Sequence, residues 1–232
     1  MRTAAWTDSV SVLDRMTAIL DAFGEVGEVG DGLGVTELAR RANLPKSTVS
    51  RIAADLVDEG YLDRVAGHLY LGLRLFELGQ SVERPRRLRR LAMSAMLGLR
   101  DGVGHNVQLA VADGADVVVI ANARGKDERF PAAHIGERLP RAATALGAAF
   151  AAFEQRRSDR PPGSVGQPVT VYEAYHGDHV CVASPVFERQ STIAALSVSG
   201  MIDALDPVEI SPYVHRAAAT ISRRIAAETA ET

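Results

Sequence analysis

Residues 35–71 constrain the fold of this chain more than any other stretch of the sequence. They read VTELARRANLPKSTVSRIAADLVDEGYLDRVAGHLYL, in which Thr36 suits the cap of a short helix that ends at residue 42. A turn with a proline follows, and the proline suits the first position of a second helix over residues 46–59. Two short apolar alternations around Ala66-Gly67 then predict a β-hairpin. The stretch therefore predicts a winged helix-turn-helix.

The second helix of this stretch has two distinct faces. Its buried side is predicted by the helical spacing of Val49, Ile52, Ala53 and Leu56. The opposite side is small, polar and basic, which suits the major groove of DNA, and Arg51 can read guanine through two hydrogen bonds. The expected DNA contacts are Lys46, Ser47, Thr48, Ser50 and Arg51 in this helix, with Arg40, Arg64 and His68 beside it.

The charge of the N-terminal third is unusual for a DNA-binding domain. Residues 1–80 contain 8 Lys/Arg against 12 Asp/Glu, whereas such domains are usually basic. The sign changes over residues 36–54, where four basic residues accompany a single acid, Glu37. Winged domains also serve as protein-interaction modules, so that alternative stays open beside DNA binding.

The rest of the chain predicts an α+β arrangement. Residues 9–24 have helical periodicity with Ser9 as the expected cap, and a helical run over 73–102 contains Pro85, which should break or kink it. From His105 the apolar period changes to two. The expected elements are strands 106–112 and 117–123, helix 144–156, strands 168–174, 179–187 and 191–200, and helix 207–228. Such an order is typical of an antiparallel sheet covered by helices.

A run of arginines flanks Pro85. It admits three interpretations: a solvated helix face, which the sequence favours, a second phosphate contact, or a salt-bridged dimer seam. The residues concerned are Arg84, Arg86, Arg87, Arg89 and Arg90.

Composition excludes several classes of protein. The formal net charge is -3, and no apolar run approaches the roughly 20 residues that span a bilayer. The N-terminus lacks the apolar core of a signal peptide. Cys181 is the single cysteine, so an intrachain disulfide is impossible. We therefore expect a cytoplasmic protein without a membrane partner.

Five stretches together resemble the IclR family of bacterial transcription regulators. In order they are VTELARRANLPKSTVSRIAADLVDEGYL, HLYLGLRLFELG, RLPRAATALGAAFAAF, VCVASPVF and AALSVSG. The resemblance implies a winged helix-turn-helix over residues 1–72, a linker helix over 73–87, and a GAF/PAS-like domain for effector binding and oligomerisation over 88–232. It also implies palindromic operator DNA, a homodimer or dimer of dimers, and a small organic or aromatic acid as effector.

The same resemblance implies effector contacts at matching positions. These are Ala145 and Leu146 in the ATALG turn, Cys181 in VCVASP, and Ser197 and Ser199 in SVSG. Strand alternation supports the two serines, because residues i and i+2 share a face.

Arg124, after the second strand, is a candidate to pair with a carboxylate ligand, and a plain surface charge is the equal alternative. The segment 155–180 is shorter than the family pattern and rich in Pro and Gly. The family's acid before the cysteine is missing, and Glu173 is the nearest replacement. A shortened segment predicts a more open pocket.

Three competing chemistries centre on the same region. Cys181 with His176 or His179 would suit a nucleophile and base, but no nucleophile elbow is present and a cysteine in an apolar strand is typical of a core. The same three residues, with His134 or Glu173, would suit zinc. An aromatic effector pocket would use Tyr172, Tyr175, Phe130 and Phe187.

Weighed together, these patterns predict a ligand-responsive DNA-binding regulator, a repressor rather than an activator. Neither a cofactor nor a metal is expected, and the protein is expected not to be an enzyme. The alternative is an enzyme or a protein-interaction module built on the C-terminal α+β domain.

Overall fold

The computed structural model describes residues 11–24, 32–126, 133–158, 171–175, 178–189 and 191–230, and for 152–158 and 171–175 it describes the backbone alone. The chain divides into two compact units, Met1–Val82 and Glu83–Thr232. Within the described residues, no helix is long and apolar enough to cross a lipid bilayer.

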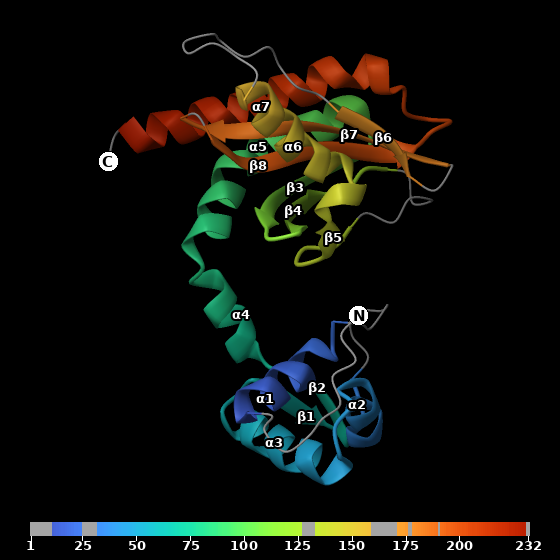
Figure 1. Ribbon diagram of the computed structural model, residues 1–232, viewed down its shortest axis with the longest axis vertical. Helices are drawn as coiled ribbons and strands as arrows, with labels where there is room; N and C mark the ends of the chain where they lie inside the picture. The colour runs from blue at the N-terminus through green and yellow to red at the C-terminus, as the bar shows by residue number, and fades with distance from the viewer. Residues whose placement is uncertain are drawn as a thin grey trace. The chain divides into compact units, whose positions relative to one another are not determined.

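The first unit is the predicted winged helix-turn-helix (Figure 1). Its core contains all four residues predicted to be buried in the helix over residues 46–59. Leu38 of the preceding helix and Leu62 and Leu69 of the hairpin belong to it as well. The elements are α1 (Val12–Asp21), α2 (Val35–Arg41), α3 (Lys46–Asp58), β1 (Leu62–Val65), β2 (His68–Leu71) and α4 (Leu73–Gln80).

Two helix caps differ from the prediction. Ser11, rather than Ser9, caps α1, because Asp14 stands three residues later and completes a reciprocal capping box. Gly34 is the N-cap of α2 and makes no side-chain cap, so the role predicted for Thr36 is wrong.

The turns of the first unit use positive φ angles. Asn43 between α2 and α3 has φ 53, a conformation that asparagine tolerates better than most residues. Ala66 and Gly67 have φ 49 and 85, the signs that a tight hairpin turn requires at both central positions. The residue before the N-cap of α2 also binds the hairpin, because Leu33 and Leu69 exchange two backbone hydrogen bonds of 2.8 and 2.9 Å.

The helical run around Pro85 is broken, but before the proline. Helix α4 ends at Gln80 and belongs to the first unit, and α5 (Glu83–Val103) starts the second unit. Pro85 therefore lies in the first turn of α5, where its missing N–H has no helical partner to lose.

The second unit is a six-stranded antiparallel sheet between helices (Figure 1). Its strand order is β5-β4-β3-β8-β7-β6. The predicted strands are present, and a short one, β5, was missed because it has three residues and ends in proline. The strands are β3 (Asn106–Asp113), β4 (Asp116–Ala123), β5 (Arg138–Pro140), β6 (Val171–Tyr175), β7 (His179–Glu188) and β8 (Ser191–Met201).

The two faces of the sheet bury different side chains. Helices α5 and α7 (Pro207–Ala230) cover one face over valines and leucines such as Val107, Leu109 and Val198. Helix α6 (Ala145–Ser158), preceded by the short η1 (Arg141–Ala143), covers the other face over smaller residues such as Ala110 and Ala195. The α6 face also buries the polar side chains of Gln108, Ser197 and Ser199, so it is the more polar of the two.

Candidate DNA-reading surface and effector face

The outward side of α3 presents the residues that the sequence analysis selected. Lys46, Ser47, Ser50 and Arg51 are exposed and Thr48 is half-buried, while the four apolar residues of the helix are buried. No acid lies in the first turn of α3. The helix therefore offers a polar and basic surface at the end where a helix attracts phosphate.

The backbone at the start of α3 adds to this surface. Pro45 is the N-cap and makes no side-chain hydrogen bond, and the first intrahelical donor is the Val49 N–H, at 3.0 Å from Pro45 O. The amide groups of residues 46–48 precede that bond, so they are the donors that an incoming phosphate would meet.

Arg40 is exposed, as expected, but it is engaged in an ion pair. Its Nη2 and Nε atoms lie 2.6 and 2.9 Å from the carboxylate oxygens of Glu37, which Arg41 also contacts at 2.7 Å. Hydrogen bonds from Arg40 and then Arg41 lower the pKa of Glu37 to about 2. Glu37 therefore stays ionised at neutral pH and offsets part of the positive charge of α2.

The wing carries its two predicted contacts on its exposed side. Arg64 in β1 and His68 in β2 are both exposed and flank the Ala66-Gly67 turn. Leu62 and Leu69 anchor the hairpin in the core. The DNA roles of these residues remain predictions.

The α6 face of the sheet carries a buried polar cluster. Gln108 in β3 accepts hydrogen bonds at Oε1 from the hydroxyls of Ser197, at 3.2 Å, and Ser199, at 3.1 Å. Strand register places Gln108 opposite Ser197 in β8 and opposite Asn122 in β4. The predicted pairing of the two serines on one face is confirmed.

Gln108 and Asn122 were missed by the sequence analysis. A signal existed for Gln108, because a lone amide alternates with alanines in the strand NVQLAVA and must point to the same face as they do. For Asn122 the sequence offers no comparable signal, since its partner Ala133 lies beyond the strand.

Cys181 lies beside this cluster. It is half-buried and stands opposite Ser199 in β8 and Glu173 in β6. The side chain of Glu173 lies outside the described residues, so its predicted role stays a prediction. His179 shares the face of Cys181 by alternation, but His176 and Phe130 also lie outside the description. In the part of the chain that the structure describes, no three potential metal ligands gather.

The start of α6 closes over the same face. Ala145 and Leu146 are buried, and Thr144 caps the helix by accepting from the Gly147 N–H at 3.0 Å. Arg124 is exposed just beyond β4, and the next residue, Gly125, donates to Asn106 Oδ1 at 2.8 Å. Asn106 stands opposite Ser199, so the loop that carries Arg124 is tied to the end of the polar cluster.

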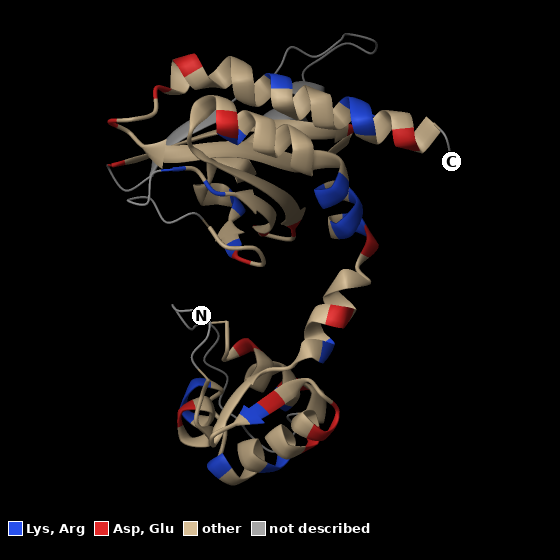
Figure 2. Ribbon diagram, turned by 180° about the vertical axis from the view of Figure 1, so that it is seen from behind, with Lys and Arg blue, Asp and Glu red and all other residues tan. Residues whose placement is uncertain are grey.

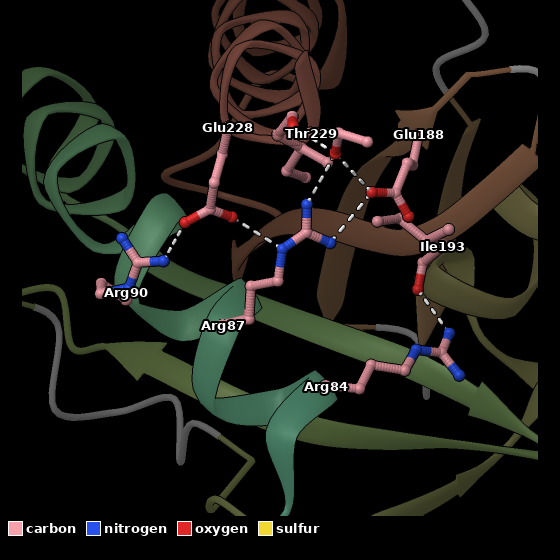
Figure 3. A network of polar contacts seen from close by, with 8 residues as sticks. Arg84, Arg87, Arg90, Glu188, Ile193, Glu228 and Thr229 are labelled. Atoms are coloured by element: carbon pink, nitrogen blue, oxygen red, sulfur yellow. Dashed lines mark hydrogen bonds and ion pairs between the residues drawn. The ribbon is translucent and has the colours of Figure 1, made fainter. Parts of the chain in front are cut away.

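Three of the five arginines around Pro85 bind within the chain (Figure 3). Arg87 contacts Glu228 at 2.7 Å, Glu188 at 2.9 Å and Thr229 Oγ1 at 2.9 Å. Arg90 pairs with Glu228, and Arg84 donates to the backbone oxygen of Ile193 at 2.8 Å. Figure 2 shows the basic positions gathered on the first turns of α5. The favoured interpretation of a solvated face is therefore wrong for Arg87, which is half-buried, whereas Arg84 and Arg90 are exposed and also bind within the chain.

This network joins four elements of the second unit. It ties the first turns of α5 to the end of β7, to the start of β8 and to the C-terminal turn of α7. A cavity of about 680 Å³ opens beside it, lined by Thr229 and by three arginines and three glutamates, so it has no net charge to select an ion. We interpret the network as a structural fastening of α5.

Acid should loosen this fastening. Burial raises the pKa of Glu188, but hydrogen bonds from Arg87 and Thr229 outweigh it and hold the pKa below its ordinary 4.5. Arg90 and then Arg87 lower the pKa of Glu228. Because both folded pKa values are depressed, the stabilisation is complete above the unfolded pKa and is lost as pH falls through the folded values. Thermal unfolding of the full chain should show a melting temperature that declines below about pH 4.5.

The variant Arg87→Met provides the comparison for this pH dependence. It removes the cation that contacts both carboxylates, and Arg90 still lowers the pKa of Glu228, so the melting temperature should start lower and decline less steeply with acid. Parallel pH profiles for the two proteins would contradict the assignment.

The fold and these two surfaces define a class of protein. An exposed reading helix in a winged helix-turn-helix, together with a sheet domain that carries a polar face under a helix, is the architecture of a ligand-responsive transcription regulator.

Comparison with known proteins gives the family. The IclR helix-turn-helix domain matches residues 12–66, and the domain described as bacterial transcriptional regulator IclR C-terminal matches residues 81–160. The chain belongs to the IclR family of bacterial transcriptional regulators. These families and relatives are regulators rather than enzymes, which confirms the expectation that the chain is not an enzyme.

Individual relatives agree with this placement. The HTH-type transcriptional regulator XynR of Escherichia coli (strain K12) is 27% identical over 88% of this chain and 91% of its own length. The transcriptional repressor IclR of the same strain is 30% identical over 65% of this chain and 55% of its own length. An IclR homolog from Microbacterium hydrocarbonoxydans, solved in complex with 4-hydroxybenzoate, has a TM-score of 0.77 at 25% identity, covering 94% of this chain and 100% of that one.

Proposed function

We propose that this regulator is a repressor that binds a palindromic operator and leaves it when a small organic or aromatic metabolite binds the second unit. The observation that carries the proposal is the exposed side of α3, where Lys46, Ser47 and Arg51 stand at a helix start with no acid and no side-chain cap. Similarity to a transcriptional repressor and to a homolog complexed with 4-hydroxybenzoate supports it. Such a regulator works beside the chromosome, so we place it in the cytoplasm.

Repression by this route depends on the distance between two reading helices. Half-sites of an operator lie about 34 Å apart, one turn of DNA, so a small displacement of the linker is enough to lose binding. In the second unit, Arg87 ties α5 to β7 and α7. The strand paired with β7 is β8, which carries Ser197 and Ser199. A ligand on the α6 face would therefore act on strands that hold the start of α5.

A homodimer is proposed from an uncovered apolar surface in the first unit. Helix α4 has no buried residue, and its Leu73 and Phe76 are 67% and 62% exposed. Val12 and Leu13 of α1 are exposed as well. Leu73 and Phe76 stand three residues apart on one helix, so they are neighbours on its surface, and exposed apolar patches mark protein interfaces. Light scattering should therefore report at least a dimer mass at micromolar concentration, and a monomer would contradict the proposal.

The decisive experiment is a gel shift with DNA from beside the gene of this protein. We expect a shift that a scrambled sequence does not compete and that weakens steeply with salt, because phosphate contacts supply much of the affinity. Equal binding to scrambled DNA would contradict sequence-specific repression, and no shift at all would favour the protein-interaction alternative.

A further inference from the structure

The hydrogen-bond polarity of the α6 face is set by Gln108. Its Oε1 has two lone pairs, and the hydroxyls of Ser197 and Ser199 donate to it at 3.2 and 3.1 Å. Each hydroxyl has a single proton, so both protons are committed to Gln108. The two serine oxygens keep only lone pairs for a further partner. All three side chains are at least 95% buried.

Asn122 presents another acceptor on the same face. Its Nδ2 donates to Ala133 O at 2.9 Å, which fixes the orientation of the amide because the oxygen would be repelled by that carbonyl. Its Oδ1 is buried and has no hydrogen-bond partner within the described residues. A buried acceptor without a partner costs free energy, which an incoming donor would relieve. Register places Asn122 directly opposite Gln108.

The remaining hydrogen-bonding capacity is complementary to a hydroxyl group. While Gln108 holds both serine protons, the two serine oxygens and Asn122 Oδ1 can only accept, and the Nε2 atom of Gln108 carries two N–H donors. A hydroxyl both donates and accepts, so it satisfies both kinds of group. A carboxylate has lone pairs alone and would face three acceptors. None of these side chains is charged, so no ion pair is offered at this point.

We propose that the effector is a hydroxyl-bearing metabolite, an alcohol or a phenol, and that Gln108 sets this preference by holding the hydroxyl protons of Ser197 and Ser199. The inference rests on the proposed function of the second unit as the effector domain. It adds to that function the residue that decides specificity and the group of the ligand that is recognised. A carboxylate on the same ligand would have to be bound elsewhere, and the backbone at the start of α6 offers N–H donors for it.

The test uses calorimetric titration of the full chain with matched pairs of probes. The pairs are 4-hydroxybenzoate with benzoate, 3-hydroxybutyrate with butyrate, and gluconate with hexanoate. We expect the hydroxylated member of at least one pair to bind at least about tenfold more tightly, since an acceptor left unpaired in a buried site strongly disfavours the analogue that lacks the donor.

Variants make the role of Gln108 specific. In Gln108→Leu the serine protons are released and can donate to a carboxylate, so the preference should move toward the member without the hydroxyl. Loss of general stability alone would weaken both members equally. The double variant Ser197→Ala with Ser199→Ala should bring the ratio within a pair close to one. Ser191→Ala, at the exposed start of the same strand, should keep the wild-type ratio.

Three results would overturn the proposal. They are equal or tighter binding of the members without hydroxyl, no binding of any hydroxylated probe up to about 10 mM, and an unchanged ratio in both variants. Gel shifts on the same samples separate this failure from failure of the proposed function. An intact operator shift without hydroxyl preference rejects the ligand inference alone, and a hydroxyl preference without an operator shift rejects the repressor.

Discussion

Replacement of Arg51 by alanine is expected to weaken operator binding by about 5- to 150-fold, the range for one bidentate arginine–guanine contact worth about 1–3 kcal/mol. Arg51 is exposed on α3, on the side opposite the buried Val49 and Ile52. Because its side chain takes no part in the core, the melting temperature should stay unchanged. Gel-shift titration and thermal unfolding of the same preparation measure both quantities.

Two further variants show whether Arg51 reads sequence or only contributes charge. Arg223→Ala removes the same exposed side chain from α7 and should leave the affinity unchanged. Lys46→Ala, expected to lose a phosphate contact, should weaken specific and scrambled DNA alike and reduce the salt dependence by about one charge. If Arg51→Ala also weakens both DNAs equally, the assignment of Arg51 to base recognition is wrong.

Replacement of Gly147 by alanine is expected to destabilise the second unit by about 1–3 kcal/mol or more, as overpacking of a tight contact does. A Cβ at this position would lie 1.9 Å from Arg141 O and 2.6 Å from Arg141 C. These are backbone atoms of η1, so α6 and η1 would have to separate. The neighbouring Ala145 and Leu146 would move with them, and effector binding should fall in parallel.

The matched control is alanine at another helical glycine. Gly98 in α5 is exposed, and a Cβ there would meet no atom within 4 Å. Gly98→Ala should therefore stabilise the chain by about 0.5–1 kcal/mol, because alanine loses less backbone entropy in a helix. Denaturant unfolding of both variants should give changes of opposite sign. Changes of the same sign would contradict the close contact between η1 and α6.

Helix α3 was predicted from the sequence because the residues that determine its buried and exposed sides are only a few positions apart. The spacing of Val49, Ile52 and Leu56 determines one buried face, and the exposed position of Arg51 follows from the same periodicity. The helix caps were predicted less well. Ser9 and Thr36 were chosen by residue type, whereas the cap of α1 depends on the reciprocal bond between Ser11 and Asp14.

The effector face was predicted in part. Ser197 and Ser199 follow from alternation along a single strand, but their common acceptor Gln108 lies 89 and 91 residues away. No periodicity relates positions so distant. The partner of each hydroxyl was therefore decided by strand order, which brings β3 beside β8.

The sequence by itself determined the helix-turn-helix, the hairpin, the order of the helices and strands apart from β5, and the side of α3 that faces outward, because each follows from contacts between near neighbours. The tertiary structure alone decided the use of the arginines around Pro85. Arg87 meets Glu188 and Glu228, 101 and 141 residues away, and becomes a fastening rather than a solvated charge. The tertiary structure also brings Gln108 within reach of Ser197 and Ser199. Both serine hydroxyls donate to its Oε1, so their oxygens remain as acceptors.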